Sequence, residues 1–411
     1  MGRECLAPHD RDPAGYGSVV KRPRVLFVNG GLLGLRSFHD YLADMLPRQD
    51  RITGEQILLT ADLTLFDRVV RRILCQRLWN DGWIGVQNLD LARLRHEWHA
   101  GVLARRRMSA VMRHAPVDVL HFHRQATAYA SLDVMRRVPS IVTMDCTQRI
   151  LMDAASSRIE RATYMPNLWR DGKIFSAAAA IVATSAWAAE SLRACYPGCR
   201  TPVHVLPDPV LLHHFDRTWI EQRRARAAAG ALPRFLFMGG DFPRKGGLAL
   251  LEAWKAGRFQ GRATLDLVTD WPLTHPLPGG VRQLGGVTVH SSAWRASWAA
   301  ADAFVMPTVN EAFGLVYQEA AAAGIPAIGT RHNAIPEFIR DGETGFLVPC
   351  GEPTALVAAM DRLSASPDLR AGMGRRAREV VEGTAAPEGY LARLTEIVVD
   401  VVRRGPAPAG S

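Results

Sequence analysis

Long apolar stretches are missing from this sequence. The richest run, residues 177–183, is much shorter than the roughly 18 to 20 apolar residues that a helix needs to cross a bilayer. Residues 1–20 mix charged residues with His, Pro and Gly, and they lack the apolar core of a signal peptide. We therefore expect a cytoplasmic protein whose only membrane contact would be peripheral, at the inner membrane surface.

Cysteine is also scarce, with 6 residues scattered along 411 positions. This pattern does not predict a disulfide framework. Cys195 and Cys199 bracket a turn, but no His or Cys pair nearby completes a zinc site. The Asp-x-Asp pair of Asp10 and Asp12 lies in a polar tail rather than at a strand end, where a diphosphate-bound metal would need it. We expect neither a metal ion nor a cofactor.

Lysine is the rarest of the charged residues. The chain has only 4 lysines against 46 arginines. A lysine where the chain otherwise uses arginine indicates that a compact point charge is needed. Lys245, which follows an apolar run and a Gly239-Gly240 turn, is therefore a candidate functional cation.

The formal net charge of +10 is concentrated in one half of the chain, because residues 1–205 hold 28 of the 50 basic and only 19 of the 40 acidic residues. Such a surplus suits an anionic partner, either a phospholipid surface, a lipid diphosphate or nucleic acid. The sequence has no aromatic stacking motif, zinc-ligand spacing or recognisable reading helix, so we do not expect nucleic acid as a partner.

Residues 67–79 combine apolar side chains at helical spacing with four arginines. Two interpretations remain open. The segment is either an amphipathic helix packed on its own domain or a helix that lies on a membrane surface.

Length and apolar patterning predict two α/β domains. Apolar runs that read as buried strands alternate with helical patterns, which is typical of doubly wound parallel sheets. In the first half of the chain the expected strands are 24–28, 56–59, 117–122, 140–144, 180–184 and 203–206. In the second half they are 235–238, 264–269, 286–290, 303–306, 327–329 and 345–348.

These patterns divide the chain into an N-terminal and a C-terminal Rossmann-like domain joined by a Pro-, Arg- and Ala-rich linker. Ligand is expected between the domains, at the carboxyl ends of the strands. The expected segments are a disordered tail at 1–20, the first domain at 21–206, the linker at 207–232, the second domain at 233–387, a last helix at 388–404 that returns to the first domain, and a disordered tail at 405–411.

Two glutamates, Glu311 and Glu319, flank the predicted start of a helix at Gly314. A helix start offers unpaired N–H groups and partial positive charge, which favour a diphosphate. Carboxylates accept hydrogen bonds from vicinal hydroxyls, such as those of a hexose and a ribose. The segment therefore predicts a nucleotide-sugar site.

The C-terminal half resembles the retaining glycosyltransferases of family 4, whose signature is a Glu, seven residues and a second Glu. The resemblance extends to residues 235–247, 323–330, 336–339, 341–349 and 351–357. It implies the GT-B fold, in which two Rossmann-like domains face a cleft. It also implies transfer of a hexosyl group from a UDP- or GDP-sugar to a glycan, lipid or lipid-linked acceptor. A GT-B nucleotide-sugar epimerase and a non-catalytic nucleotide-sugar-binding protein remain as alternatives.

The residues that match the family's positions form the candidate site. The resemblance implies catalytic roles for Glu311, His123 and Lys245, where His123 ends the strand of Asp118-Val-Leu-His-Phe-His123. The expected donor-binding residues are Gly34, Arg244, Lys245, Phe313, Gly314, Leu315 and Glu319. Arg36 and Asp145 are expected on the acceptor side. No protein nucleophile is evident, which favours front-face substitution over a covalent intermediate.

Two features depart from known patterns. Family 4 carries an arginine directly after the glycine of the Lys245 loop, and this chain has Gly240-Asp241 there. The glycines Gly30, Gly31 and Gly34 do not form a GxGxxG, and no acidic residue follows at dinucleotide spacing, so a dehydrogenase is not expected.

Overall fold

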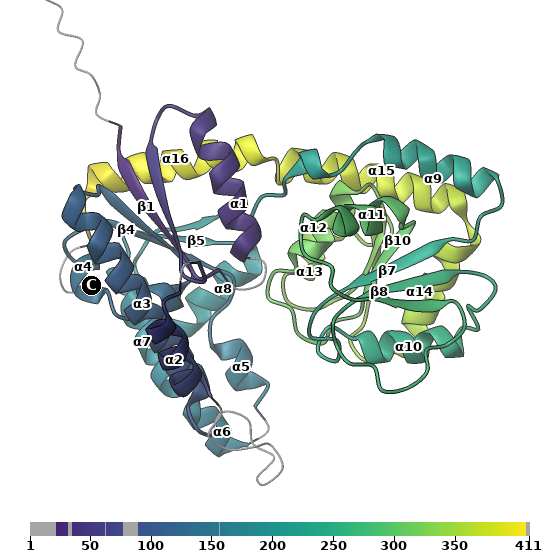
Figure 1. The fold of residues 1–411 in the computed structure, drawn as a ribbon, viewed down its shortest axis with the longest axis horizontal. Helices are drawn as coiled ribbons and strands as arrows, with labels where there is room; N and C mark the ends of the chain where they lie inside the picture. Colours follow the sequence, from purple (N-terminus) through teal and green to yellow (C-terminus); the bar gives the residue numbers. More distant parts are fainter. Residues whose placement is uncertain (1–21, 32–34, 62, 77–88, 156, 408–411) are drawn as a thin grey trace, which may run out of the picture.

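The computed structural model describes residues 22–31, 35–61, 63–76, 89–155 and 157–407. They form two α/β domains side by side, each built on a parallel six-stranded sheet (Figure 1). The predicted tail at 1–20 and the Asp10–Asp12 pair lie outside these residues.

The N-terminal sheet has the strand order β2-β1-β3-β4-β5-β6. Side chains alternate between its two faces, as the period of two in a strand requires. Val25 and Phe27 of β1 pack on the face covered by α1 and α16, whereas Leu26 and Val28 pack on the face covered by α3, α7 and α8. The sheet is therefore doubly wound. Its strands are β1 Arg24–Asn29, β2 Thr53–Leu58, β3 Val119–His123, β4 Ser140–Met144, β5 Ala180–Ala183 and β6 Val203–Val205.

The helices of this domain differ widely in length. They are α1 Leu35–Met45, α2 Leu65–Cys75, α3 Ala92–His114, α4 Leu132–Met135, α5 Arg149–Asp153, α6 Arg158–Thr163, α7 Met165–Ala177 and α8 Ala186–Cys195.

The C-terminal sheet has the order β12-β11-β10-β7-β8-β9. Its strands are β7 Arg234–Met238, β8 Thr264–Val268, β9 Val281–Leu284, β10 Ala303–Met306, β11 Ala327–Thr330 and β12 Gly345–Val348. Its helices are α9 Thr218–Ala228, α10 Gly247–Ala256, α11 Ser292–Ala300, α12 Leu315–Ala322, α13 Ile335–Phe338, α14 Pro353–Ala365 and α15 Pro367–Thr384.

One strand prediction is wrong. Residues 286–290 are not a strand, and the edge strand β9 lies earlier, at Val281–Leu284. Gly286 and His290 have φ angles of 69° and 65°, which are incompatible with extended backbone. The left-handed residues at both ends of the segment prevent it from pairing with a neighbouring strand, despite its apolar residues.

The segment expected to be a linker, 207–232, is more structured than its composition indicates. It contains α9, and the guanidinium of Arg223 is buried and donates to the carbonyls of Ala301, Ala323 and Trp298. These carbonyls belong to the ends of α11 and α12, so α9 packs as part of the C-terminal domain.

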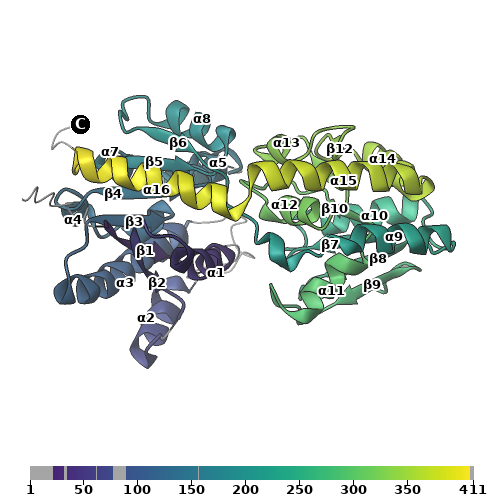
Figure 2. The ribbon, with the colours of Figure 1, turned by 90° about the horizontal axis from the view of Figure 1, so that it is seen from above.

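The chain returns to the N-terminal domain through α16, Pro387–Arg404. Leu394, Val398 and Val401 are buried against the sheet, and the hydroxyl of Tyr41 in α1 donates to the Pro387 carbonyl at 2.8 Å. Figure 2 shows α15 along the C-terminal domain and α16 along the N-terminal one. Among the described helices, none has the length and apolar composition to cross a bilayer.

Candidate active site

The segment between β10 and α12 is fixed by its own side chains. Gly314 directly precedes α12 as its N-cap, with a φ of 78°, a left-handed conformation that favours glycine. A Cβ at this position would lie 2.8 Å from the Tyr317 ring and 3.2 Å from Cγ of Glu311. The Tyr317 hydroxyl donates to the Met306 carbonyl at 2.7 Å. The start of α12 is therefore held close to the carboxyl end of β10.

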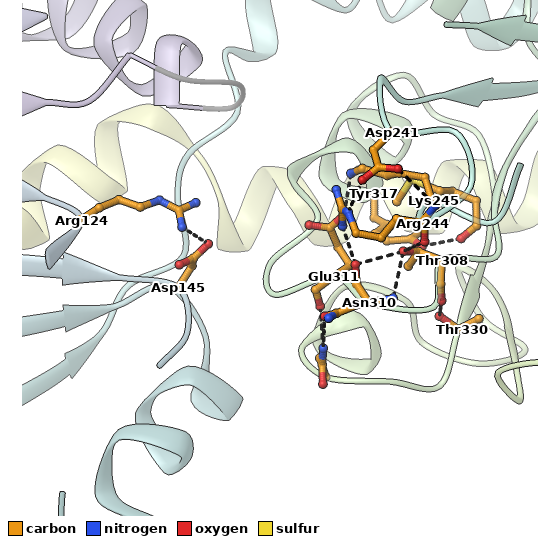
Figure 3. Close-up of polar contacts among 12 residues, drawn as sticks. Arg124, Asp145, Asp241, Arg244, Lys245, Thr308, Asn310, Glu311, Tyr317 and Thr330 are labelled. Atoms are coloured by element: carbon orange, nitrogen blue, oxygen red, sulfur yellow. Dashed lines mark hydrogen bonds and ion pairs between the residues drawn. The ribbon is translucent and has the colours of Figure 1, made fainter. Parts of the chain in front are cut away.

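Lys245 reaches this helix start from the loop after β7. Its Nζ lies 2.5 Å from Oε2 of Glu311, and both side chains are mostly buried, at 18% and 15% exposure (Figure 3). Arg244 lies beside it, with a terminal guanidinium nitrogen 2.5 Å from the Asn310 carbonyl and 3.8 Å from Oε2 of Glu311. The structure thus brings two cations and a carboxylate to the helix start.

The backbone of this loop is joined to the β10–α12 segment. The Arg244 carbonyl accepts hydrogen bonds from the Val309 amide and the Thr308 hydroxyl, both at 3.1 Å. Gly246 has a φ of 80°, and a Cβ there would lie 2.0 Å from the Pro307 carbonyl oxygen. Only glycine allows this approach, so the position of Lys245 is set before any ligand arrives.

Asp241 occupies the place where the family carries an arginine. Its carboxylate accepts from Nε of Arg244 at 3.0 Å and from the Arg244 amide at 3.3 Å. Asp241 therefore orients Arg244, which lies three residues further along.

Glu319 lies inside α12 and is only 8% exposed. Burial raises the pKa of this carboxyl to about 7, against the opposing effect of Lys245. It lines a separate small cavity of about 10 Å³ with Leu315, Ser37 and His290. Phe313, also expected at the donor site, is buried and packs edge-on against Phe338.

His123 ends β3 in a buried position. Its ring stacks on Phe38 with centroids 3.9 Å apart, and its Nε2 lies 4.0 Å from Oδ2 of Asp208. Burial, together with the nearby charge-bearing groups His121 and Arg124, holds the pKa of His123 well below its usual value. The imidazole is therefore neutral at physiological pH.

Arg124 follows His123 with a φ of 91°, a strained conformation for a residue other than glycine. Its guanidinium lies 2.5 Å from the carboxylate of Asp145, which follows β4 (Figure 3). The carboxyl ends of two central strands thus hold an ion pair in which Asp145 is buried and Arg124 is 38% exposed.

One cavity of about 270 Å³ connects the domains. Arg124 and Asp145 line it from the N-terminal domain, and Arg244, Asn310 and Glu311 line it from the C-terminal domain. Predicted donor-side and acceptor-side residues therefore share a cavity. The other predicted residues that the structure describes do not line it: His123, Lys245, Phe313, Gly314, Leu315 and Glu319.

Two predicted residues are not placed. Gly34 lies outside the described residues. Arg36 belongs to α1, but its side chain is likewise outside the described part of the chain.

Four residues near these contacts were not predicted. Arg124 and Asn310 line the cavity, Asp208 lies near His123, and Asn333 donates its side-chain amide to the Glu311 carbonyl at 3.1 Å. Burial raises the pKa of Asp208 to about 7, opposed by the charge of Arg124. Asp208 stands between two prolines at the domain junction, a signal that could have drawn attention to it.

Residues 232–366 match the family model for glycosyl transferases group 1. This match includes Lys245, Glu311 and Glu319. A curated relative, the N-acetyl-alpha-D-glucosaminyl L-malate synthase of Bacillus anthracis, is 38% identical over 105 residues, which is 26% of this chain and 28% of that protein. The chain thus matches little more than a quarter of that relative's length.

Solved structures extend the likeness to both domains. Sucrose-phosphate synthase from Thermosynechococcus elongatus superposes with a TM-score of 0.68 at 16% identity, covering 93% of this chain and 100% of that one. HepE from Anabaena, solved in complex with UDP and glucose, gives a TM-score of 0.62 at 15% identity over 92% and 100% of the two chains. These similarities confirm the predicted GT-B fold. The family match itself is confined to the C-terminal part of the chain.

Proposed function

We propose that this protein is a retaining glycosyltransferase that moves a hexosyl group from a UDP- or GDP-sugar to an acceptor hydroxyl. The observation that carries the proposal is the approach of Lys245 and Arg244 to the start of α12 beside Glu311. Arg244 and Glu311 also line a cavity shared by both domains. The likeness to HepE, which was solved with UDP and glucose, supports a nucleotide-sugar donor.

The donor diphosphate would lie at the start of α12, near the amides of Phe313, Gly314 and Leu315. Departure of the nucleoside diphosphate leaves new negative charge on its oxygens. The backbone N–H groups of the helix start and the two cations would together stabilise that charge. In the free protein Glu311 holds the Lys245 ammonium, and a bound diphosphate would share it. Glu311 then accepts hydrogen bonds from the hexose, and Glu319 from the ribose.

The acceptor would occupy the part of the cavity lined by Arg124 and Asp145. Neutral His123 lies behind it at the end of β3, within reach of the transferred sugar in our proposal. With no protein nucleophile assigned, we propose front-face substitution: the acceptor oxygen bonds to the anomeric carbon as the bond to the diphosphate breaks. The acceptor proton passes to the departing phosphate oxygen. We propose that no metal ion takes part.

A panel of UDP-, GDP- and ADP-sugars tests the proposal. A donor that binds the folded state raises the melting temperature by mass action, so one base and sugar should stabilise the protein most. Product analysis by NMR should then show a transferred hexose with the donor's anomeric configuration, and chelator should not reduce the rate. Transfer with inverted configuration, or a changed sugar without acceptor, would contradict the proposal.

A further inference from the structure

The helix α2 presents its apolar side chains to solvent. Leu65, Phe66, Val69 and Ile73 are 75%, 68%, 48% and 62% exposed. Leu65, Val69 and Ile73 follow one another at intervals of four residues, so they form a stripe along one side of the helix, and Phe66 lies beside that stripe. We refer to these four residues as the α2 face.

The polar side of α2, not its apolar side, attaches it to the domain. Asp67 is buried and its carboxylate lies 2.7 Å from the guanidinium of Arg106 in α3. Thr64 and Asp67 also form a reciprocal capping box at the start of the helix. This arrangement reverses the usual amphipathic helix, which buries its apolar stripe. Of the two interpretations left open by the sequence, the helix does pack on its own domain, but it does so through Asp67 and leaves the apolar stripe exposed. Residues 77–79 of the predicted segment lie outside the described residues.

The exposed charge on α2 has one sign. Arg68, Arg71 and Arg72 are exposed, whereas the helix's acidic residue, Asp67, is the buried partner of Arg106. Arginines flanking an apolar stripe match the surface of an anionic bilayer, where the side chains enter the acyl boundary and the cations meet phosphates. Pairing of α2 with a second copy of itself is less favourable, because it would bring the arginines of the two helices together.

The neighbouring helix α3 also has apolar side chains that are exposed to solvent. Trp98 and Val102 are 47% and 48% exposed, and the guanidinium of Arg170 from α7 lies 5.1 Å from the Trp98 ring. Tryptophan is enriched at the interface between membrane and water. Figures 1 and 2 show α2 beside α3 and projecting away from the N-terminal sheet.

We propose that the α2 face docks this protein onto an anionic phospholipid bilayer, with α2 lying in the interfacial plane. Leu65, Phe66, Val69 and Ile73 insert between headgroups, and Arg68 and Arg72 bind lipid phosphates. The helix is about 16 Å long at about 1.5 Å per residue, so it lies on the membrane and does not span it. This inference is independent of the proposed activity.

Sedimentation with vesicles tests it directly. The full-length protein should bind vesicles of phosphatidylcholine mixed with phosphatidylglycerol, and bind pure phosphatidylcholine vesicles at least about tenfold more weakly. The double variant F66S/I73S should lose at least about tenfold in binding, since two inserted side chains become polar. The double variant R68Q/R72Q should bind the mixed vesicles more weakly, and its binding should depend less on salt concentration.

The matched control is Leu248→Ser, which changes a 53% exposed leucine on α10 in the other domain. It should bind like the unaltered protein, and all variants should keep the melting temperature of the unaltered protein because the changed side chains are exposed. Equal vesicle binding by F66S/I73S and L248S would overturn the proposal. So would a dimer in light scattering that F66S/I73S dissociates, since the α2 face would then bind a second copy.

Discussion

Lys245 places an ammonium group beside Glu311, close to the start of α12. Its stem runs along Gly239, where an added Cβ would lie 3.2 Å from Cγ of the lysine, and its ammonium meets Glu311 at 2.5 Å. A planar guanidinium differs from an ammonium in shape and in the directions of its donors. The rarity of lysine in the sequence identified this residue, and its contacts are consistent with a need for that side chain.

Lys245→Ala should lower kcat about 100-fold, comparable to losing one fixed donor to developing negative charge, and should affect donor binding less. Lys245→Arg should not restore the rate. The control Lys255→Ala removes a lysine whose partner is Glu252 on the surface of α10, and should leave steady-state kinetics unchanged. A loss that appears only in KM would contradict the role assigned to Lys245.

Glu319 makes the stability of the protein depend on pH. Its pKa rises from 4.5 to about 7 on folding, so the folded state holds a proton that the unfolded state releases between these values. This contribution to stability is fully present below pH 4.5 and is lost as pH rises to about 7. Linkage relates a shift of this size to roughly 3 kcal/mol.

Glu319→Gln removes this titration. In urea unfolding, the free energy of unfolding of the variant minus that of the unaltered protein should increase by about 2 to 3 kcal/mol as the pH rises from 5 to 8. Glu343→Gln, on a side chain that is 60% exposed, should show no such trend. A constant difference between Glu319→Gln and the unaltered protein across this range would show that Glu319 ionises normally.

Residue types, spacing and the family resemblance together predicted Lys245, Glu311, Glu319 and Asp145 as candidates. The structure pairs Lys245 with Glu311 and places Glu311 and Asp145 on the shared cavity. Arg124 was not predicted, because one arginine among 46 carries no signal. Its relevance comes from a φ of 91° and from pairing with Asp145, and both are set by tertiary structure.

At the scale of elements, the loop before α10 holds the proposed catalytic cation. Gly246→Ala should be strongly destabilising, by more than about 3 kcal/mol, because a Cβ 2.0 Å from the Pro307 carbonyl forces the loop away from β10. Gly230→Ala is the control, since Gly230 has a φ of 79° with nothing within 4 Å of an added Cβ. It should cost only about 1 to 2 kcal/mol. If chemical denaturation gives the same loss in free energy of unfolding for both variants, the loop does not require the close approach of Gly246 to the Pro307 carbonyl.

Most strands could be predicted because buried parallel strands are continuous apolar runs. β9 could not, since its side chains are partly or fully exposed at the sheet edge and its sequence, Val281-Arg-Gln-Leu284, has no such run. The helix α9 was not predicted, because the Pro-, Arg- and Ala-rich composition of the segment indicated a linker. Burial of Arg223 depends on carbonyls from α11 and α12, which sequence does not reveal.

At the scale of the whole molecule, one carboxylate joins the two domains at a helix start. Glu337 of α13 accepts hydrogen bonds from the Ala186 and Trp187 amides at the start of α8, both at 2.8 Å. A carboxylate there also complements the helix dipole. This contact helps to set the distance across the shared cavity.

Glu337→Ala should favour arrangements in which the two domains lie further apart. If the contact contributes about 1 kcal/mol, the ratio of open to closed molecules should rise about fivefold. Small-angle scattering should give a larger radius of gyration than for Glu343→Ala, whose partner Arg340 lies within the same domain. Identical radii would mean that other contacts hold the domains.

The order of two α/β domains could be read from the alternation of apolar runs and helical patterns. How the domains approach each other could not, because pairs such as Glu337 with the start of α8 are more than 100 residues apart and have no local signature. For the same reason the sequence did not show that Arg124 and Arg244 line one cavity.

The central claim is that the start of α12, with Lys245 and Arg244, holds the diphosphate of an activated sugar. A crystal structure with the nucleotide sugar that most stabilises the protein tests it most directly. We predict diphosphate oxygens within about 3 Å of the Lys245 Nζ and of backbone N–H groups at residues 313–315, with the sugar toward Glu311. A diphosphate bound elsewhere, with Lys245 still paired only to Glu311, would contradict the claim.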